Sequence, residues 1–524
     1  MIRNFNKFKF STPFSIALIT MVIYGSCSTE REGNRLPKNP NIIVILADDM
    51  GYGDVSALNP ESRVRTPAID RMVNEGISFS NAHASASVCT PSRYGFLTGR
   101  YAFRSENGAF GIGGFAGPVI ESGRETLASL LKEAGYHTGI VGKWHLGLDW
   151  KAKGNEEGIQ FDDQSGYSNV DYSQPVGSGP NDYGFDYSFI HPASLDIPPY
   201  LFLKDHHVID PEMILTTDVY PTRLENTTYA WDKKHSNEEA VYWEKGVWWR
   251  QGEMSSSFRI EDCHDEILEE GLSFIDSRAE EHPEQPFFLY MPLTGPHTPW
   301  VPTDEFKGKT PIGLYGDFVL NIDDVVEQVQ NALIKHGIRE NTILVFSSDN
   351  GAYWPQEEIE LHDHDSNWGR RGQKGDIWEG GHRVPLIISW PEKIEKASVY
   401  TPLVSLIDFF ATFMDLTGQK MSSGSGEDSF SFFHVLDGHP EKPVRTSMVH
   451  HSSGGMYSFS NENYKFIEGL GSGGFTAPQF EEPKPDGPQG QLYRIDLDST
   501  ESQNLFLEHP DLANSMSQTL KSSK

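Results

Sequence analysis

The stretch NIIVILADD, residues 41–49, decides the fold. Its continuous apolar run is rich in β-branched residues and stops at two aspartates. A run without alternation between polar and apolar residues predicts a strand buried on both faces, as in a parallel sheet covered by helices. We therefore expect an α/β fold.

Three other segments repeat this pattern, namely TGIVGKWH (138–145), PFFLYMPLTGPH (286–297) and NTILVFSSDN (341–350). Each one ends at polar side chains, which are Lys143 and His145, then His297, and then Asp349 and Asn350. Amphipathic helical patterns lie between the runs, such as ETLASLLKEAG (125–135) and DDVVEQVQNALIKHG (323–337). Because ligands bind at the carboxyl ends of the strands in an open α/β sheet, the four runs predict one site at that edge.

Length and charge limit the classes of function. A chain of 524 residues can bury a large core and more than one structural unit. Its formal net charge of -31 at pH 7 argues against nucleic acid as a partner, because binding would need a basic surface. Salt screens the overall field within about 8 Å, so a local cluster of cations can still bind an anion.

The N-terminal stretch MIRNFNKFKFSTPFSIALITMVIYGSCSTE is typical of an export signal, with basic residues before a short apolar run at 14–24. The run is too short to span a bilayer. Small residues precede Cys27, which resembles a lipoprotein processing site, and plain cleavage by signal peptidase is the alternative. We expect residues 1–27 to be the signal and the protein to be exported, either periplasmic or lipid-anchored at the bacterial cell envelope.

A metal site is predicted by the oxygen donors at two of the strand ends. Asp48 and Asp49 follow one run, and Asp349 and Asn350 follow another. Hard oxygen donors suit Ca²⁺ or Mg²⁺, whereas structural zinc favours cysteine and histidine. The histidine-rich pieces KDHHV (204–208) and LHDHD (361–365) lie in polar sequence, so we interpret them as surface or substrate contacts.

Cys89 is one of three cysteines in the chain and lies in VCTPSRYGFLTGR, residues 88–100. Thr90 can cap a helix that has Pro91 in its first position, which would put Cys89 just before the helix. Free N–H groups and the helix dipole favour negative charge there, and Arg93 adds a cation. The segment therefore predicts an anion site around Cys89.

Cys263 has a different setting, in RIEDCHDEILEEGLSFIDSRAEE, residues 259–281. Apolar residues recur there at helical spacing, so we expect a buried thiol on the apolar face of a helix. A disulfide between Cys263 and Cys89 is the alternative that the sequence leaves open.

These motifs resemble the type I sulfatase family, in which a cysteine is converted to formylglycine. The segment from Cys89 through Pro91, Ser92 and Arg93 to LTGR looks like the first signature, and GYHTGIVGKWHLG (135–147) is similar to the second. NIIVILADDMGYGD, PHTP, SSDNG and GRRGQKGDIWEGGHRVPLI follow the family's order over roughly residues 41–390. The resemblance implies an alkaline-phosphatase-like α/β sandwich, with a large, mainly parallel sheet and a small C-terminal α+β subdomain.

The resemblance also implies roles for individual residues. One Ca²⁺ would be held by Asp48, Asp49, Asp349, Asn350 and residue 89 itself, after a maturation enzyme has converted Cys89 to formylglycine. The sulfate would be surrounded by Arg93, Lys143, His145, His297 and Lys374. A hydrated aldehyde solves a chemical problem, since a thiol attacking sulfur would form a thiosulfate ester with no easy exit. His297 or Lys374 would protonate the leaving sugar oxygen, and His145 would take the proton of the second hydroxyl.

We expect two structural units, a catalytic α/β domain at 38–435 and a C-terminal subdomain at 436–524. MYSFSNENYKFIEG (456–469) and QLYRIDL (491–497) predict a small antiparallel sheet, and HPDLANSMSQTLKSS (509–523) predicts a helix. Residues 150–282 are interpreted as an aromatic-rich insertion. Its clustered tryptophans either pack among themselves or form a stacking wall for sugar rings, and they are Trp231, Trp243, Trp248 and Trp249.

The export signal and the aromatic residues favour a sulfated carbohydrate over a small phenolic ester. By likeness to bacterial glycan-degrading sulfatases, we expect exo action on sulfated galactose or N-acetylgalactosamine, with the sulfate on O6. A phosphatase or phosphodiesterase of the same superfamily is one alternative. A protein that binds sulfated glycans without catalysis is the other.

Overall fold

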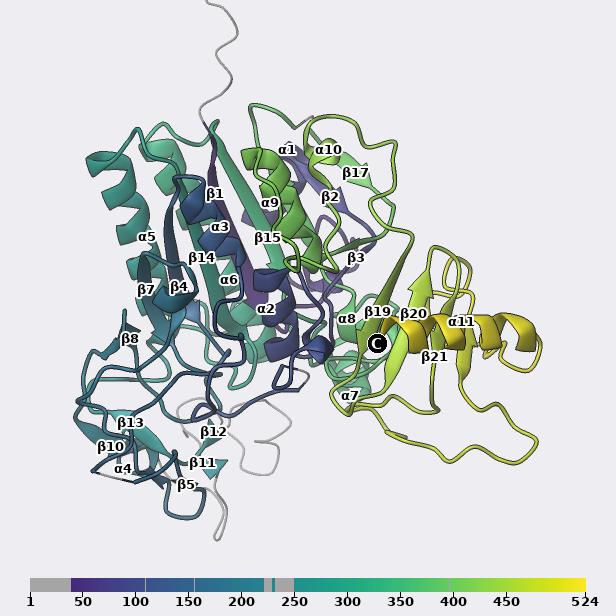
Figure 1. The fold of residues 1–524 in the computed structure, drawn as a ribbon, viewed down its shortest axis with the longest axis horizontal. Helices are drawn as coiled ribbons and strands as arrows, with labels where there is room; N and C mark the ends of the chain where they lie inside the picture. Colours follow the sequence, from purple (N-terminus) through teal and green to yellow (C-terminus); the bar gives the residue numbers. More distant parts are fainter. Residues whose placement is uncertain (1–38, 109, 155, 221–228, 231–248, 395) are drawn as a thin grey trace, which may run out of the picture. The chain divides into compact units, whose positions relative to one another are not determined.

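Strand β1 (Asn41–Asp48) lies inside a large sheet of the computed structural model, which describes residues 39–524 except 109, 155, 221–228, 231–248 and 395. Within these residues the sheet has ten strands, in the order β17 (Ser398–Tyr400), β2 (Ile77–Phe79), β16 (Leu386–Ser389), β15 (Thr342–Ser348), β1, β14 (Phe287–Pro296), β4 (His137–Lys143), β7 (Tyr187–His191), β8 (Leu203–Lys204) and β9 (His207–Val208). The neighbours β15, β1, β14, β4 and β7 are all parallel (Figure 1). The four predicted strands are therefore confirmed, and they are adjacent.

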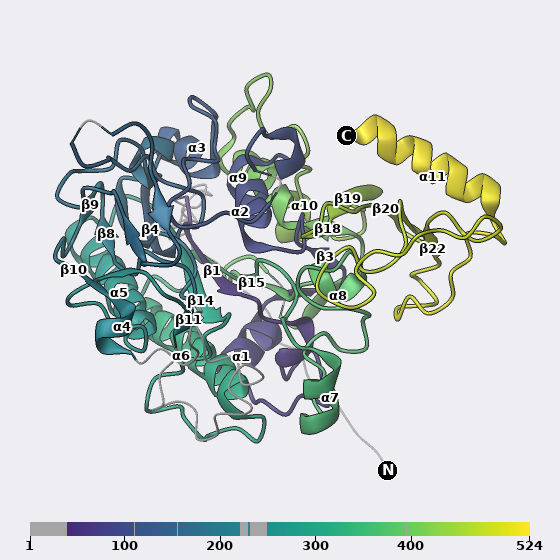
Figure 2. The same cartoon turned by 90° about the horizontal axis from the view of Figure 1, so that it is seen from below.

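Strand β1 explains why its sequence lacks alternation. Ile42, Val44 and Leu46 face one apolar cluster, whereas Ile43 and Ile45 face another. The first cluster contains side chains of α2 (Cys89–Thr98), α3 (Leu127–Glu133) and α9 (Phe409–Thr417). The second contains side chains of α1 (Pro67–Glu75), α5 (Cys263–Glu281) and α6 (Gly313–Lys335). Figure 2 shows the sheet between these two layers of helices, as the continuous apolar run predicts.

The carboxyl ends of the parallel strands meet at one edge of the sheet, which is where the site was expected. Asp48 ends β1, Lys143 ends β4, and His297 and Asp349 directly follow β14 and β15. Just beyond two of the strands, Asp49 (φ +67°) and His145 (φ +53°) adopt left-handed backbone conformations. Such conformations are uncommon for residues other than glycine and concentrate at functional sites.

Residues 150–282 are not an insertion throughout. Within this range β7, β8 and β9 extend the main sheet, and α5 packs against β14 and β4. The strand β7 is short and is flanked by polar loops, so its sequence lacks the long apolar run that predicted the other strands. Trp231, Trp243 and Trp248 lie outside the described residues. Trp249 is buried against Tyr220, with ring centroids 4.9 Å apart, so it packs inside the protein.

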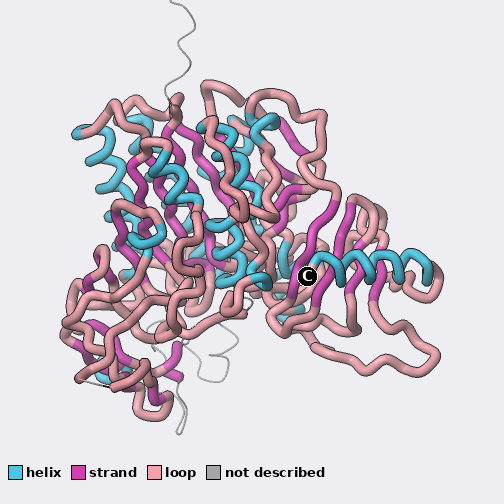
Figure 3. The backbone as a smooth tube through the Cα atoms, viewed as in Figure 1, coloured by secondary structure: helices cyan, strands magenta, loops and turns pink. Residues whose placement is uncertain are grey.

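The C-terminal region forms a separate antiparallel sheet, as predicted (Figures 1 and 3). Its strands run in the order β19 (Ser447–His451), β20 (Tyr457–Asn461), β21 (Lys465–Ile467) and β22 (Gln491–Tyr493). The closing helix α11 (Pro510–Ser523) packs on β20 and β21. The strand β19 is an addition to the prediction.

Short elements complete the described chain. Two-stranded sheets pair β10 (Met213–Leu215) with β13 (Glu253–Ser255), β11 (Tyr229–Ala230) with β12 (Trp249–Arg250), β18 (Val404–Ser405) with β3 (Ala82–His83), and β5 (Phe161–Asp162) with β6 (Tyr167–Ser168). The short helices are α4 (Thr216–Val219), α7 (Gln356–His362), α8 (Glu379–His382), α10 (Phe433–Leu436) and the 3₁₀ turns η1 (Tyr52–Asp54), η2 (Ala102–Arg104), η3 (Pro180–Tyr183) and η6 (Leu406–Asp408).

The predicted export signal at 1–27, with Cys27, lies outside the described residues. In the part of the chain that is described, none of the helices combines the length and the apolar character that crossing a membrane requires.

Candidate active site

Cys89 is the first residue of helix α2. The preceding residue, Val88, is extended and takes the N-cap position without a side-chain hydrogen bond. The predicted cap by Thr90 is therefore wrong, because its hydroxyl instead donates to the carbonyl of His145 at 3.1 Å. This contact ties the first turn of α2 to the loop after β4 and brings two of the predicted site segments together.

Asp48 is the point where the predicted nucleophile and two predicted cations meet. Its Oδ1 lies 3.3 Å from the Sγ atom of Cys89 and 3.5 Å from an η-nitrogen of Arg93. Its Oδ2 accepts a hydrogen bond of 2.6 Å from Nζ of Lys143, which also lies 2.8 Å from Ser194 Oγ. Asp48, Arg93 and Lys143 are all completely buried.

Acidic residues at the other strand ends also form ion pairs with predicted cations. Arg93 donates from Nε to Asp349 Oδ2 at 2.8 Å, and one of its η-nitrogens lies 2.7 Å from the same oxygen as an ion pair. Lys374 Nζ lies 2.8 Å from Asp49 Oδ2, and His297 Nε2 lies 3.7 Å from the same oxygen. Every residue that was predicted for the site thus belongs to one connected cluster or to the loops around it.

The buried carboxylates of this cluster repel one another electrostatically. Burial opposes the ionisation of Asp48, but the positive charge of Lys143 and its neighbours outweighs burial and holds the Asp48 pKa well below its ordinary value. Burial raises the pKa of Asp349 despite Arg93, and the adjacent charge of Asp48 adds to the effect. A divalent cation between these groups would relieve the conflict.

The carboxylate and amide oxygens of this cluster fit a hard divalent cation. Asp48 and Asp49 offer ligand atoms within 4.8 Å of one another, in a group that also includes Cys89 and His297. Asn350 donates from Nδ2 to Asp49 Oδ1 at 2.7 Å, and its own Oδ1 is buried without a hydrogen-bond partner among the described residues. A buried amide oxygen costs free energy unless something binds it, so this orphaned acceptor supports a cation at that point.

The unmodified thiol of Cys89 is a poor nucleophile. Burial, followed by the negative charges of Asp349 and Asp48, raises its pKa well above the ordinary value. The expected stabilisation of negative charge by the helix terminus and Arg93 is therefore outweighed for the thiol itself. The protonated thiol is the less nucleophilic form of the side chain.

His145 is arranged as a proton acceptor. Its Nε2 lies 2.9 Å from the carbonyl oxygen of Ile112, which can only accept, so Nε2 carries the hydrogen and Nδ1 keeps a lone pair. Nδ1 has no hydrogen-bond partner among the residues that the structure describes. Burial, with help from Lys143, lowers the His145 pKa well below its ordinary value and keeps the ring neutral. His297 is oriented in the opposite way, because its Nδ1 faces the carbonyl of Thr298 and its Nε2 is left toward Asp49.

These groups line a cavity of about 1180 Å³. Five of the predicted site residues line this cavity, namely Cys89, Asp49, His145, His297 and Lys374. Arg93 and Lys143 are not among the described residues that line it. These two buried cations pair with the carboxylates of Asp48 and Asp349, which are likewise not among the described lining residues.

Asp196 was missed by the sequence analysis, although it is buried and lines the same cavity. Its Oδ2 accepts from Arg250 at 2.6 Å, and its Oδ1 lies 3.9 Å from His297 Nδ1. Burial is opposed by the charges of His297 and Arg250, which lower the Asp196 pKa. The residue lies five positions after β7 (Tyr187–His191), and because that strand was not predicted, no predicted strand end pointed to Asp196.

Other predictions have mixed outcomes. His364 was interpreted as a surface or substrate contact, but it is buried and lies 2.8 Å from Asp54 Oδ1. His206 does lie at the surface, beside Asp182. Cys263 is buried at the start of α5, as predicted, and both Cys263 and Cys89 are free, so the alternative of a disulfide is wrong.

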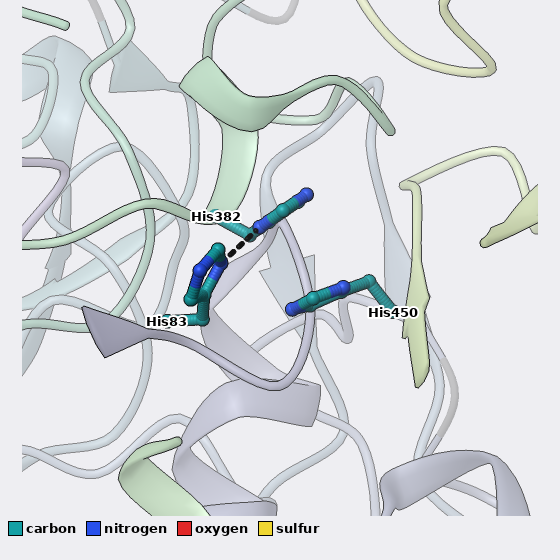
Figure 4. A group of neighbouring side chains, drawn as sticks. All are labelled: His83, His382 and His450. Atoms are coloured by element: carbon teal, nitrogen blue, oxygen red, sulfur yellow. Dashed lines mark hydrogen bonds between the residues drawn. The ribbon is translucent and has the colours of Figure 1, made fainter. Parts of the chain in front are cut away.

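A second cluster of potential ligands lies away from the cavity and joins β3, α8 and β19. It consists of His83, His382 and His450 (Figure 4). The rings of His382 and His450 stack with centroids 3.8 Å apart and an angle of 13°. A metal ion binds an imidazole in the plane of its ring, about 2.0–2.1 Å from nitrogen for zinc, so two stacked rings cannot share one ion.

The charges around the histidine cluster also argue against a bound metal ion. Lys465 Nζ lies 3.0 Å from His382 Nε2 and is paired with Glu379 and Glu501. Arg383 is also paired with Glu379. The two cations already balance the two acids, and a divalent ion would add uncompensated charge to a buried region. We therefore assign the cluster a structural role, in which it joins the C-terminal sheet to the large sheet's loops.

Comparison with known proteins identifies the class of this site. Residues 40–419 match the Sulfatase family. The chain is 33% identical to an N-acetylgalactosamine-6-O-sulfatase of Bacteroides thetaiotaomicron, over 94% of this chain and 95% of that protein. It is 30% identical to human arylsulfatase G, over 82% of this chain and 74% of that protein.

Solved structures agree with the sequence comparison. One structure, from work on glycosaminoglycan metabolism by B. thetaiotaomicron, has a TM-score of 0.77 and 31% identity, and covers 93% of this chain and 99% of its own. Another was solved with its substrate D-glucosamine-2-N,6-O-disulfate; it has a TM-score of 0.59 and 18% identity, over 93% of this chain and 97% of its own. The site thus defines a hydrolase of sulfuric esters on an alkaline-phosphatase-like fold, as the motifs implied. The chain belongs to the sulfatase family.

Proposed function

We propose that this sulfatase removes the 6-O-sulfate from galactose or N-acetylgalactosamine at the end of a sulfated glycan. The observation that carries the proposal is the similarity, over nearly the whole of both chains, to a protein named as an N-acetylgalactosamine-6-O-sulfatase. The buried reacting groups support exo action, because the end of a glycan reaches a cavity more easily than its middle does.

Three side chains that line the cavity, those of Lys374, His145 and His297, carry out the proposed sulfate binding and proton transfer. Lys374 lines the cavity, as does Arg250, and the charge of Lys374 attracts the sulfate. Burial opposes this charge, but Asp49 outweighs burial and raises the Lys374 pKa above its ordinary value, so the side chain stays protonated. The free Nδ1 of His145 accepts a proton, and His297 or Lys374 protonates the departing sugar oxygen.

Two groups implied by the family complete the proposal. Asp48, Asp49, Asp349 and Asn350 would hold Ca²⁺, which polarises sulfate oxygens. Formylglycine at residue 89, produced from Cys89 by a maturation enzyme, would supply a hydroxyl nucleophile. Burial and the nearby aspartates raise the pKa of the Cys89 thiol, so the unconverted side chain would be a weak nucleophile here.

Sulfate release from a panel of defined sulfated monosaccharides tests the substrate. We expect the highest kcat/KM on the 6-sulfates of N-acetylgalactosamine and galactose. Preference for a 4-sulfate, or for the 6-sulfate of N-acetylglucosamine, would overturn the proposed position or sugar. Activity on long chains but on none of the monosaccharides would overturn exo action.

Two parallel assays separate the alternatives. A phosphatase of the same superfamily would hydrolyse sugar 6-phosphates at rates that match the sulfates. A glycan-binding protein without catalysis would bind the sulfated sugars but release no sulfate even when residue 89 is fully converted. We expect sulfate release and slower hydrolysis of phosphate esters.

We also propose that the protein is exported and that Cys27 carries a lipid anchor. The basic residues, the apolar run at 14–24 and the small residues before Cys27 support this location. Fractionation of producing cells, with metabolic labelling by a fatty acid, tests it. Unlabelled protein in the soluble envelope fraction would indicate plain cleavage instead.

A further inference from the structure

A loop of the C-terminal region, residues 472–479, forms part of the cavity wall. Phe475, Thr476, Ala477 and Gln479 line the cavity together with Lys374 and Cys89, which come from distant parts of the chain. The small C-terminal sheet therefore contributes to the active site through this loop as well as packing beside the large sheet.

Asp376 holds the loop in place. Its Oδ1 accepts from the backbone N–H groups of Phe475 (2.7 Å) and Thr476 (3.0 Å), and its Oδ2 accepts from the Thr476 hydroxyl at 2.5 Å. Asp376 is two residues from Lys374, a cation that lines the cavity. The loop is thus fixed relative to the group that meets the sulfate.

Phe475 presents an aromatic ring beside Lys374. A Cβ atom built on Gly375 would lie 2.9–3.0 Å from three ring carbons of Phe475, so one face of the ring covers this glycine. Tyr353 meets the ring at an interplanar angle of 78°, with centroids 6.3 Å apart. Phe475 remains 45% exposed although it is a large apolar side chain. An apolar face left open beside a sulfate-binding cation suits the C–H face of a pyranose ring.

Gln373 supplies a polar group on the same wall. Its Nε2 lies 3.3 Å from Thr476 Oγ1, which can accept from it because the Thr476 hydrogen is donated to Asp376. The opposite atom, Gln373 Oε1, is buried and has no hydrogen-bond partner in the described part of the chain. Gln373 lines the cavity, so a donor on the substrate can satisfy this oxygen. A sugar hydroxyl or acetamido N–H is such a donor.

We propose that Phe475 and Gln373 form a sugar-binding subsite, in which the ring of Phe475 stacks on the pyranose and Gln373 Oε1 accepts a hydrogen bond from it. The inference deepens the proposed function and rests on it. The C-terminal loop would then be a determinant of selectivity for the sugar, acting separately from the residues that carry the sulfate chemistry.

Steady-state kinetics on N-acetylgalactosamine 6-sulfate test the subsite. Phe475→Ala should raise KM about tenfold, which corresponds to about 1.4 kcal/mol of lost binding, while kcat changes less. Phe475→Trp should keep KM within about threefold, because it retains an aromatic face. Phe480→Ala is the matched control, since Phe480 is an exposed phenylalanine five positions further on that is not among the described cavity-lining residues. It should behave like the unaltered protein.

Gln373→Met tests the hydrogen bond at nearly constant side-chain size and should lower kcat/KM by about tenfold. Melting temperatures of all variants report whether the loop stays folded. If the unaltered protein acts on the sugar sulfate and Phe475→Ala matches Phe480→Ala in KM, the subsite is wrong while the proposed function stands. If the unaltered protein turns over no 6-sulfated galactose or N-acetylgalactosamine, the proposed function itself fails. Titration calorimetry of galactose 6-sulfate into Cys89→Ala protein gives a binding readout that needs no turnover, and there Phe475→Ala should weaken the Kd by a similar factor.

Discussion

The Sγ atom of Cys89 lies 3.3 Å from Oδ1 of Asp48, although the two residues come from a helix and from a strand of the large sheet. The contact brings the residue predicted as nucleophile against a predicted metal ligand. It also explains the raised pKa of the thiol, to which burial contributes most and the two nearby aspartates contribute further.

We predict that Cys89→Ala lowers the rate of sulfate release by more than about 10³-fold, because the group that attacks sulfur is lost. Cys263→Ala is the matched control, since Cys263 is also buried but lies at the start of α5. Mass analysis of the peptide around residue 89 should show a product lighter than the thiol. An active protein that carries only unmodified Cys89 would contradict the prediction.

We predict that removal of the metal with a chelator lowers the melting temperature, and that Ca²⁺ restores it. A ligand at 100 times its Kd stabilises the folded state by about 2.7 kcal/mol. Asn350→Leu removes the orphaned buried oxygen and should reduce the calcium-dependent shift. Melting curves with and without Ca²⁺ measure the effect without reference to activity, and an Asn350→Leu shift as large as that of the unaltered protein would contradict it.

The pair of Lys143 and Asp48 should contribute strongly to stability. Lys143→Met leaves the Asp48 carboxylate buried without its closest cation, and breaking a buried pair in this way costs about 3–5 kcal/mol. Lys204→Met is the control, because the Lys204 side chain is 50% exposed and its pairing with Glu270 is worth about 0–1 kcal/mol. Denaturant unfolding of both variants measures the difference, and equal losses would contradict this account of the cluster.

The buried histidine cluster predicts a dependence of stability on pH. Burial, followed by the charges of His382 and Lys465, lowers the pKa of His450 well below its ordinary value of 6.5, so the ring is neutral in the folded protein. Glu379 favours the charged ring, and Arg445 opposes it. The unfolded state binds a proton below pH 6.5 that the folded state does not bind. The stabilising effect of the neutral ring is therefore present above pH 6.5 and is lost as the pH falls below it.

His450→Phe should consequently lose less stability than the unaltered protein between pH 7 and pH 5, by up to about 1.4 kcal/mol per pH unit. The substitution keeps an aromatic ring to stack on His382, and neither ring nitrogen of His450 has a partner to lose. His439→Phe, at an exposed position, serves as the control. The free energy of unfolding as a function of pH checks the prediction, and identical slopes for His450→Phe and the unaltered protein would contradict it.

The sequence predicted the central strands and their active edge because both leave local signals. Strands that are buried on two faces are continuously apolar, so polar side chains occur where such a strand ends. Asp48, Lys143, His297 and Asp349 could therefore be assigned to one edge before any contact was known. Strand β7 carries a weaker signal, since it is short and lies in a polar segment.

The sequence by itself determined that polar and charged side chains follow the parallel strands, that Cys89 lies at a helix start, and that oxygen donors meet at two of the strand ends. Only the tertiary structure decided that Arg93 and Lys143 pair with the buried carboxylates, that Asp196 lies near His297, and that the loop carrying Phe475 lines the same cavity as Lys374. The physical reason is the separation, along the chain, of the residues that interact. Strand burial and helix starts depend on neighbours in the chain, whereas these contacts join residues at least 45 positions apart, the separation of Arg93 from Asp48. No local pattern encodes which distant loop will form a given wall of the cavity.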